Sequence, residues 1–263
     1  MNLWRLLLLL LPVHFLVYLP ANAETTQPTL RIAIPEDYPP YYYRDKDGQF
    51  RGASFEIAQL ICKRLGYHIN VSQLDNMRTV LAEMDAGRQD LNINLTATPE
   101  RLEVALFTKT PHIHEAQNLI VRADTDINFD GKLVPLARYR FGPIFGWTYG
   151  PQFDQAAFLD KSYVNNSSEQ LRGLLSGQFD IAVNNREFFI YTAREMGVTR
   201  AFRVLDPPVY NLPVTIAVSR QYPGAEKLVS KLEREVSQLI KEDAYQEILA
   251  RYGFISPKSE KKS

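Results

Sequence analysis

The sequence predicts an α/β fold built as two lobes with a cleft between them. Apolar runs typical of strands alternate with amphipathic stretches typical of helices, and this order favours mixed, mostly parallel sheets flanked by helices. The alternation occurs in each half of the 263-residue chain, which is long enough to bury one or two cores. In both halves polar or small residues follow a strand, and ligands of open α/β sheets bind beyond the carboxyl ends of strands.

The first half of the chain alternates three strands with two helices. Each predicted strand is a short apolar run, and each helix has apolar residues at helical spacing. Ser54 as cap and Gly66 as stop mark the first helix, and Cys62, the single cysteine, is expected to be a small core residue on its apolar side. The predicted strands are 30–34, 68–71 and 90–95, and the predicted helices are 54–66 and 75–87.

The second half repeats the alternation. Ser167 is the predicted cap of a helix ended by Gly177. The proline-rich piece Asp206–Pro213 predicts an extended return between the lobes. We expect lobe 1 to comprise residues 24–113 and 213–263, and lobe 2 to comprise residues 114–212. The predicted strands are 140–145, 179–183 and 214–218, and the predicted helices are 167–175, 186–196 and segments within 223–252.

One segment, Asn92–Arg101, carries the strongest functional signal. Polar and apolar side chains alternate up to the end of a predicted strand, so one face of that strand end is polar. Thr98 is the expected cap of the next helix, Pro99 its first residue, and Arg101 lies in its first turn. Helix-start N–H groups and a guanidinium suit a small carboxylate. A capped surface helix with a solvated arginine is the alternative.

The chain begins like a secreted protein. Its first 19 residues hold one charge, Arg5, followed by an apolar run, and Ala21-Asn22-Ala23 forms a small-x-small cleavage site. The run from Leu6 to Leu19 is short for a bilayer span. We therefore expect a cleaved signal peptide over residues 1–23 rather than a membrane anchor.

Charge and composition argue against several classes of function. Removal of residues 1–23 leaves a formal charge of −1, which offers no basic surface for nucleic acid. His112 and His114 are two residues apart and would share one face of a strand, but four histidines and one cysteine leave little for a metal site. We expect no metal, no cofactor and no nucleic-acid partner.

Five short motifs occur in a characteristic order: Asp37–Tyr41, Asp47–Gly52, Ala86–Asp90, Thr96–Arg101 and Leu174–Asp180. In order and spacing they resemble the bacterial extracellular solute-binding proteins of family 3, the polar amino-acid-binding group of ABC importers. The resemblance covers almost the whole chain after residue 23. It implies a two-lobed periplasmic binding protein-like (type II) fold, a periplasmic location, a monomer, and a membrane partner that is either an importer permease or a sensor.

The resemblance also implies roles for individual residues. Arg101 would bind the α-carboxylate of the ligand, and Thr96 and Asn94 would assist it. Tyr38 would cover the ligand, and Thr148 would reach the carboxylate from the second lobe.

Two positions depart from the family's pattern. Asn185 stands where relatives hold the ligand's ammonium with a carboxylate, and Asn76 stands where many relatives stack an aromatic ring. An asparagine cannot balance a buried ammonium, so Glu36, Asp37 or the tyrosines at 41–43 are alternatives. With Trp147 and Tyr149 as walls on the second-lobe side, the predicted ligand-binding residues are Tyr38, Asn76, Asn94, Thr96, Arg101, Trp147, Thr148, Tyr149 and Asn185.

The predicted function is capture of a small carboxylate-bearing solute, an amino acid or an analogue, by closure of the cleft about a hinge near 112–116 and 210–214. One alternative is a ligand-sensing module for a membrane receptor. Another is an enzyme similar to the dehydratases that act on prephenate-type acids, with Glu187, Glu36 or Asp37 as general acid or base. No nucleophilic triad is evident in the sequence, so we expect no catalysis and assign no catalytic residue.

Overall fold

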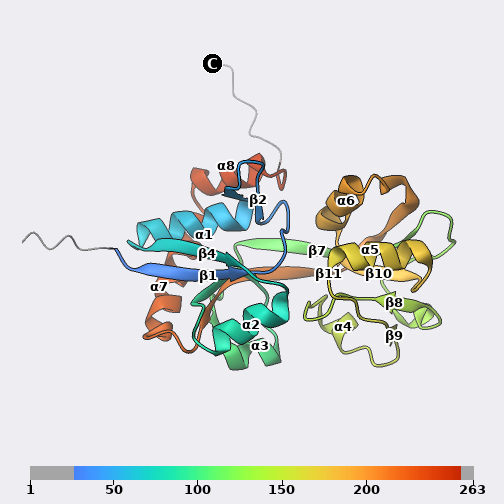
Figure 1. The fold of residues 1–263 in the computed structure, drawn as a ribbon, viewed down its shortest axis with the longest axis horizontal. Helices are drawn as coiled ribbons and strands as arrows, with labels where there is room; N and C mark the ends of the chain where they lie inside the picture. The colour runs from blue at the N-terminus through green and yellow to red at the C-terminus, as the bar shows by residue number, and fades with distance from the viewer. Residues whose placement is uncertain (1–26, 256–263) are drawn as a thin grey trace, which may run out of the picture.

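The computed structural model describes residues 27–255 and has two lobes side by side, joined by two long strands (Figure 1). The predicted signal peptide, residues 1–23, lies outside the described range. The strands are β1 (Thr29–Ile34), β2 (Tyr43–Arg44), β3 (Phe50–Arg51), β4 (His68–Gln73), β5 (Leu91–Leu95), β6 (Ala105–Phe107), β7 (Ile113–Arg122), β8 (Arg140–Gly142), β9 (Asp160–Lys161), β10 (Ile181–Asn185) and β11 (Phe202–Ser219). The helices are α1 (Ala53–Arg64), α2 (Met77–Asp85), α3 (Pro99–Val104), α4 (Pro151–Asp154), α5 (Ser167–Ser176), α6 (Arg186–Glu195), α7 (Ala225–Leu239) and α8 (Asp243–Arg251), with short 3₁₀ turns at Val134–Leu136 and Thr199–Ala201.

The sheet is mixed, and its strand order runs β4-β1-β5-β11-β7-β10-β8-β9, with β6 also paired to β11. In the first lobe β1 lies parallel to β4 and β5, and in the second lobe β10 lies parallel to β8. The antiparallel pair β7 and β11 crosses between the lobes, as Figure 1 shows, with Val214 opposite Ile113 and Tyr210 opposite Gln117. These pairs lie at the predicted hinge and at the predicted lobe boundaries, and both assignments stay predictions.

In each lobe, alternation of side chains along the strands builds a core on both faces of the sheet. In β1, Leu30 and Ile32 pack with α1, α7 and α8, whereas Ala33 points to the opposite face and packs with residues of α2. In the second lobe, Val121 and Ile120 of β7 likewise enter two separate clusters. Cys62 of α1 is buried in the first of these cores, as the sequence predicts.

Two predicted helix caps are wrong. Helix α1 begins after Gly52, so Ser54 already lies inside the helix. Only a glycine fits the position before the helix, because its φ is 118° and a Cβ there would lie 2.3 Å from the Tyr41 carbonyl oxygen. Helix α5 is capped by Asn166, whose side-chain oxygen accepts from the Glu169 N–H at 2.9 Å, so Ser167 is already helical.

The predicted start of α3 is confirmed. The Thr98 hydroxyl accepts a hydrogen bond from the Arg101 N–H at 3.3 Å, and Pro99 is the first helical residue. Within residues 27–255, no helix combines the length and the apolar character needed to span a bilayer.

Candidate functional site

Two adjoining cavities lie between the lobes, beyond the carboxyl end of β5. The inner cavity has a volume of about 30 Å³ and reaches the buried side chains of Tyr38 and Glu115. The outer cavity has a volume of about 500 Å³ and extends toward Tyr210. Residues shared by the two are Thr96, Arg101, Trp147, Thr148 and Leu212.

Arg101 is a buried cation held between the lobes. Its guanidinium donates to the Thr96 carbonyl in the first lobe and to the Gly146 carbonyl in the second, each at 2.9 Å. The side chain is 7% exposed, and no carboxylate of residues 27–255 lies within 4 Å of it. Burial lowers the pKa of Arg101 to about 10, so the group remains charged at neutral pH. A buried guanidinium whose partners are neutral carbonyls suits an anionic ligand.

Glu115 is a buried acid that lines the inner cavity, and it is not among the ligand-binding residues that the sequence predicts. It lies on the crossing strand β7 and accepts hydrogen bonds from Asn94 Nδ2 at 2.7 Å, Tyr38 Oη at 2.9 Å and Gln117 Nε2 at 3.2 Å. Burial raises the pKa of Glu115 to about 7. The available signal was the alternation of Ile113, Glu115 and Gln117 on one strand face.

An aromatic cluster walls the inner cavity. Tyr38 contacts Trp147 with ring centres 5.0 Å apart and Phe188 with ring centres 4.5 Å apart, both edge to face. Trp147 and Phe188 stack, with an interplanar angle of 4°. Tyr38 belongs to the first lobe and its two partners to the second, so these rings close the space from both sides.

Three predicted polar residues line the cavities, each with a hydrogen bond. Asn94 links Glu115 to Ser54, whose hydroxyl donates to Asn94 Oδ1 at 2.6 Å. The Thr96 hydroxyl donates to the Pro213 carbonyl at 2.9 Å, and the Thr148 hydroxyl donates to the Asp154 carboxylate.

Three other predicted residues are away from both cavities. Asn76 caps α2 through the Thr79 N–H. The Tyr149 hydroxyl is buried and accepts from the Ile144 N–H at 2.7 Å. Asn185 caps α6, and its amide donates to the Tyr41 hydroxyl of the first lobe at 2.9 Å. All three side chains serve local backbone or inter-lobe bonds, which explains why none faces the cavities.

The alternative cation sites are also occupied by other contacts. Glu36 accepts from the Ser167 hydroxyl of the second lobe at 2.8 Å, and Asp37 accepts from the Arg44 N–H at 3.2 Å. Of the tyrosines at 41–43, only Tyr42 lines the inner cavity.

The structure gives no support to a histidine metal site. His112 is buried, whereas His114 is exposed, because β7 begins only at Ile113 and the two side chains do not share a strand face. Across residues 27–255, no group of three His, Cys, Asp or Glu side chains is placed to hold a metal ion.

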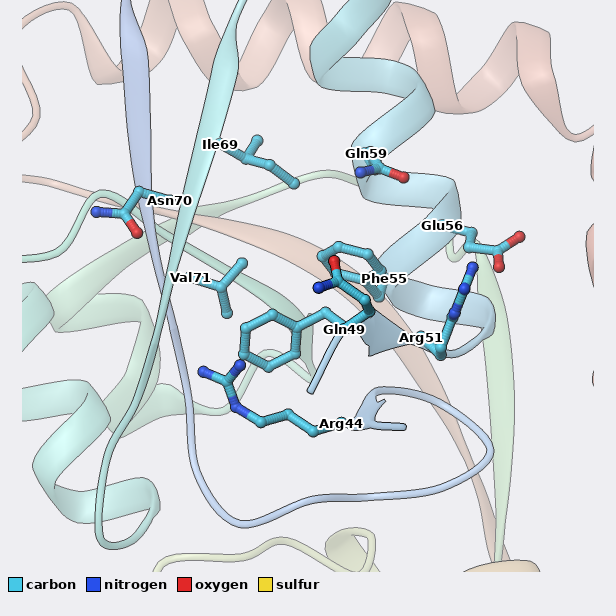
Figure 2. Close-up of a pocket in the computed structure, with 10 residues that line it drawn as sticks. Arg44, Gln49, Arg51, Phe55, Glu56, Gln59, Ile69, Asn70 and Val71 are labelled. Atoms are coloured by element: carbon cyan, nitrogen blue, oxygen red, sulfur yellow. The ribbon is translucent and has the colours of Figure 1, made fainter. Parts of the chain in front are cut away.

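A further cavity of about 440 Å³ lies on the surface of the first lobe, between the β2–β3 hairpin, α1 and β4 (Figure 2). Arg44 covers the Phe50 ring at 3.9 Å, and Arg51 pairs with Asp45 at 2.9 Å. Figure 2 shows the side chains that line this surface cavity. None of these residues lines the inter-lobe cavities.

Comparisons with known proteins agree on the class of fold. Residues 30–255 match the sequence model of the bacterial extracellular solute-binding proteins, family 3. The virulence sensor protein BvgS of Bordetella pertussis is 24% identical over 233 residues, which are 86% of this chain and 18% of that protein. This chain thus spans less than a fifth of the length of the curated relatives it matches.

Two solved structures have the same two-lobed fold. An ancestral arginine-binding protein bound to arginine has a TM-score of 0.72 at 22% identity, covering 86% of this chain and 98% of that chain. A histidine kinase sensor domain with similarity to periplasmic binding proteins has a TM-score of 0.73 at 20% identity, covering 85% of this chain and 95% of that chain.

Proposed function

This chain belongs to the bacterial extracellular solute-binding proteins, family 3, and on that premise we propose that it captures a small carboxylate-bearing solute, an amino acid or an analogue, between its lobes. The observation that carries the proposal is Arg101, which is buried and charged and whose guanidinium, among the described residues, bonds only to neutral carbonyls. A buried charge without a counter-charge in direct contact is costly, and a ligand carboxylate would provide that contact. The ancestral neighbour bound to arginine supports an amino acid as the ligand class.

The proposed mechanism couples binding to closure of the lobes. The first lobe contributes Arg101, Thr96, Asn94 and Tyr38, and the second contributes Trp147 and Thr148. A ligand that touches both lobes binds the closed form more tightly, so it shifts the population toward closure.

The proposed setting is the periplasm, where the closed monomer would dock on the permease of an ABC importer. The alternative is a ligand-sensing role on a membrane receptor, and two observations favour it. The relatives at 24% identity are named virulence sensor proteins, and one structural neighbour is a histidine kinase sensor domain. Neighbouring genes separate the two roles, since a permease and ATPase pair supports import and a receptor gene supports sensing. A dehydratase remains the less favoured alternative.

The test of the carboxylate site is calorimetric titration of the purified protein with L-amino acids and dicarboxylates. We expect Arg101→Ala to weaken binding by on the order of 100-fold, because the ligand carboxylate loses its charged partner in a buried site. Arg88→Ala is the matched control, since Arg88 is exposed and pairs with Glu83 away from the cleft. Unchanged affinity in Arg101→Ala would contradict the proposal.

A further inference from the structure

We infer that Glu115 binds a primary ammonium group of the ligand, so that the captured solute is a zwitterion whose carboxylate meets Arg101 and whose ammonium enters the inner cavity. This inference rests on the proposed function, since it takes the carboxylate of the ligand to lie at Arg101. It assigns the residue that balances the ligand's ammonium, which the sequence did not reveal, and it requires the ligand to carry a primary ammonium as well as a carboxylate.

The first step is the set of partners around Glu115. Its two oxygens accept from Tyr38, Asn94 and Gln117, all of which are neutral. A carboxylate offers about four lone-pair positions, so three donors leave one position open. No Lys, Arg or His of residues 27–255 lies within 4 Å of this carboxylate. Glu115 thus has polar hydrogen-bond donors but no cation in direct contact among the described residues.

The second step is the size of the inner cavity. Glu115 and Arg101 both line it, and its volume is about 30 Å³. Such a space accepts a small polar group such as a water molecule or an –NH₃⁺ group, whose N–H donors can reach Glu115, whereas a trimethylammonium has no N–H to donate. The outer cavity, which Arg101 also lines, has room for the rest of the ligand. The ligand therefore enters the inner cavity with its ammonium first.

The third step is the position of the other acids. Glu36 bonds to Ser167 and lines neither cavity. Asp154 lines the outer cavity, but it is exposed and already accepts from the Thr148 hydroxyl and the Tyr149 N–H. Among the acids that line the two cavities, Glu115 is the buried one, and a buried charge pair discriminates between ligands more strongly than a solvated pair.

The fourth step is the response to pH. Burial raises the pKa of Glu115 to about 7, while the hydrogen bonds from Asn94, Tyr38 and Gln117 and the charge of Arg101 oppose that rise. His112 lies behind Asn94 and Ser54, and burial lowers its pKa to about 3, so it is neutral in this range. A ligand ammonium requires the ionised carboxylate, so its binding weakens as the pH falls below about 7.

The experiment compares matched ligands by calorimetry at pH 8 and pH 6. The probes are the twenty L-amino acids, the 2-hydroxy acids that replace the ammonium of each binder with a neutral hydroxyl, and the N,N,N-trimethyl forms of the same binders. The proteins are the wild type, Glu115→Gln, Glu115→Asp and the control Glu187→Gln, whose acid is exposed on α6. Thermal denaturation of each variant checks that it is folded.

We expect the wild type to bind at least one amino acid about 100-fold more tightly than its 2-hydroxy and trimethyl counterparts. Glu115→Gln removes that preference, whereas Glu115→Asp and Glu187→Gln keep it. In the wild type the affinity for the amino acid falls by up to about tenfold per pH unit below pH 7, and in Glu115→Gln it does not.

The outcomes separate the two proposals. If amino acids and hydroxy acids bind equally well, and both depend on Arg101, the role of Glu115 is wrong and the carboxylate site stands. If the ammonium preference survives in Glu115→Gln and is lost in Asp154→Asn, the cation site is in the outer cavity and the inference fails. If no probe binds, the inference falls together with the proposed function.

Discussion

His112 is a buried imidazole at the start of the crossing strand. Its Nε2 lies 3.3 Å from the Ser54 hydroxyl, and its Nδ1 has no hydrogen-bond partner among residues 27–255. Burial lowers the pKa of His112 to about 3. The unfolded chain binds a proton near pH 6.5, so the stability that the neutral ring supports is present above that pH and is lost as the pH falls toward 3.

We expect His112→Gln to lessen the loss of stability in acid. Between pH 7 and pH 4 the buried ring costs the wild type about 3 kcal/mol of unfolding free energy, and the variant avoids this cost. Urea denaturation at both pH values measures it, with His68→Gln at an exposed position as the control. The raised pKa of Glu115 acts in the opposite direction, so each variant is compared with the wild type at the same pH. Equal losses in His112→Gln and the wild type would contradict this account.

Single residues differ in how far the sequence reveals them. Arg101 could be predicted because the cap and the proline before it fix its place in the first turn of α3. Glu115 could not, because an acid in a predicted strand is usually a solvated residue and only the sheet shows that it points inward. Asn76 and Asn185 stand at positions where relatives bind the ligand, yet the side chains of both cap helices. The family's motifs do not show which residues cap a helix in this chain.

At the level of elements, Asn185 joins α6 to the first lobe. Its side-chain oxygen caps α6 through the Phe188 N–H at 3.0 Å, and its amide donates to the Tyr41 hydroxyl. Asn166 caps α5 in the same way, through the Glu169 N–H at 2.9 Å. Asn166 and Asn185 therefore make the same N-cap hydrogen bond, but Asn185 also donates to the Tyr41 hydroxyl.

We expect Asn166→Ala to cost about 1 kcal/mol of unfolding free energy, the usual value of an N-cap. Asn185→Ala should cost about 1–3 kcal/mol more, because it also leaves the buried Tyr41 hydroxyl without its partner. Chemical denaturation of both variants, and of each combined with Tyr41→Phe, isolates the inter-lobe bond. Additive costs for Asn185→Ala and Tyr41→Phe would show that this bond contributes nothing.

The order of helices and strands can be predicted from the spacing of apolar residues, but the residues at which some of them begin cannot. Asn166 and Ser167 are both good caps, so sequence alone does not choose between them. The sequence predicts an extended return over Asp206–Pro213 and a strand over 214–218, but the prolines at 207, 208 and 213 gave no sign that both belong to the single long strand β11. The sheet accommodates Pro207 and Pro208 at a shift of register between Leu205 and Tyr210, a tertiary feature without a local signal, whereas Pro213 lies opposite His114 in the regular register.

At the level of the whole molecule, Phe188 ties the two lobes together. It belongs to α6 of the second lobe, yet it packs into the core of the first lobe beside Tyr38. Its neighbour Phe189 is equally buried but packs within the second lobe. Adjacent phenylalanines therefore separate inter-lobe packing from packing inside a lobe.

We expect Phe188→Leu to loosen closure, because the rings that meet across the cleft lose a partner. Small-angle scattering without ligand should then give a larger radius of gyration than for the wild type. Phe189→Leu should lower the thermal stability and leave the radius unchanged. The same radius in Phe188→Leu and the wild type would show that this contact does not hold the lobes together.

The burial of Cys62 has a consequence for the chemistry of the compartment in which we propose that the protein works. The thiol is 1% exposed, and burial raises its pKa to about 12. Thiol–disulfide exchange requires an accessible thiolate, so the single thiol of the folded chain does not react with oxidants or with other chains. Only a chain that has lost the core around α1 would expose the sulfur and become covalently linked, so a disulfide-linked dimer would mark molecules that have failed to fold.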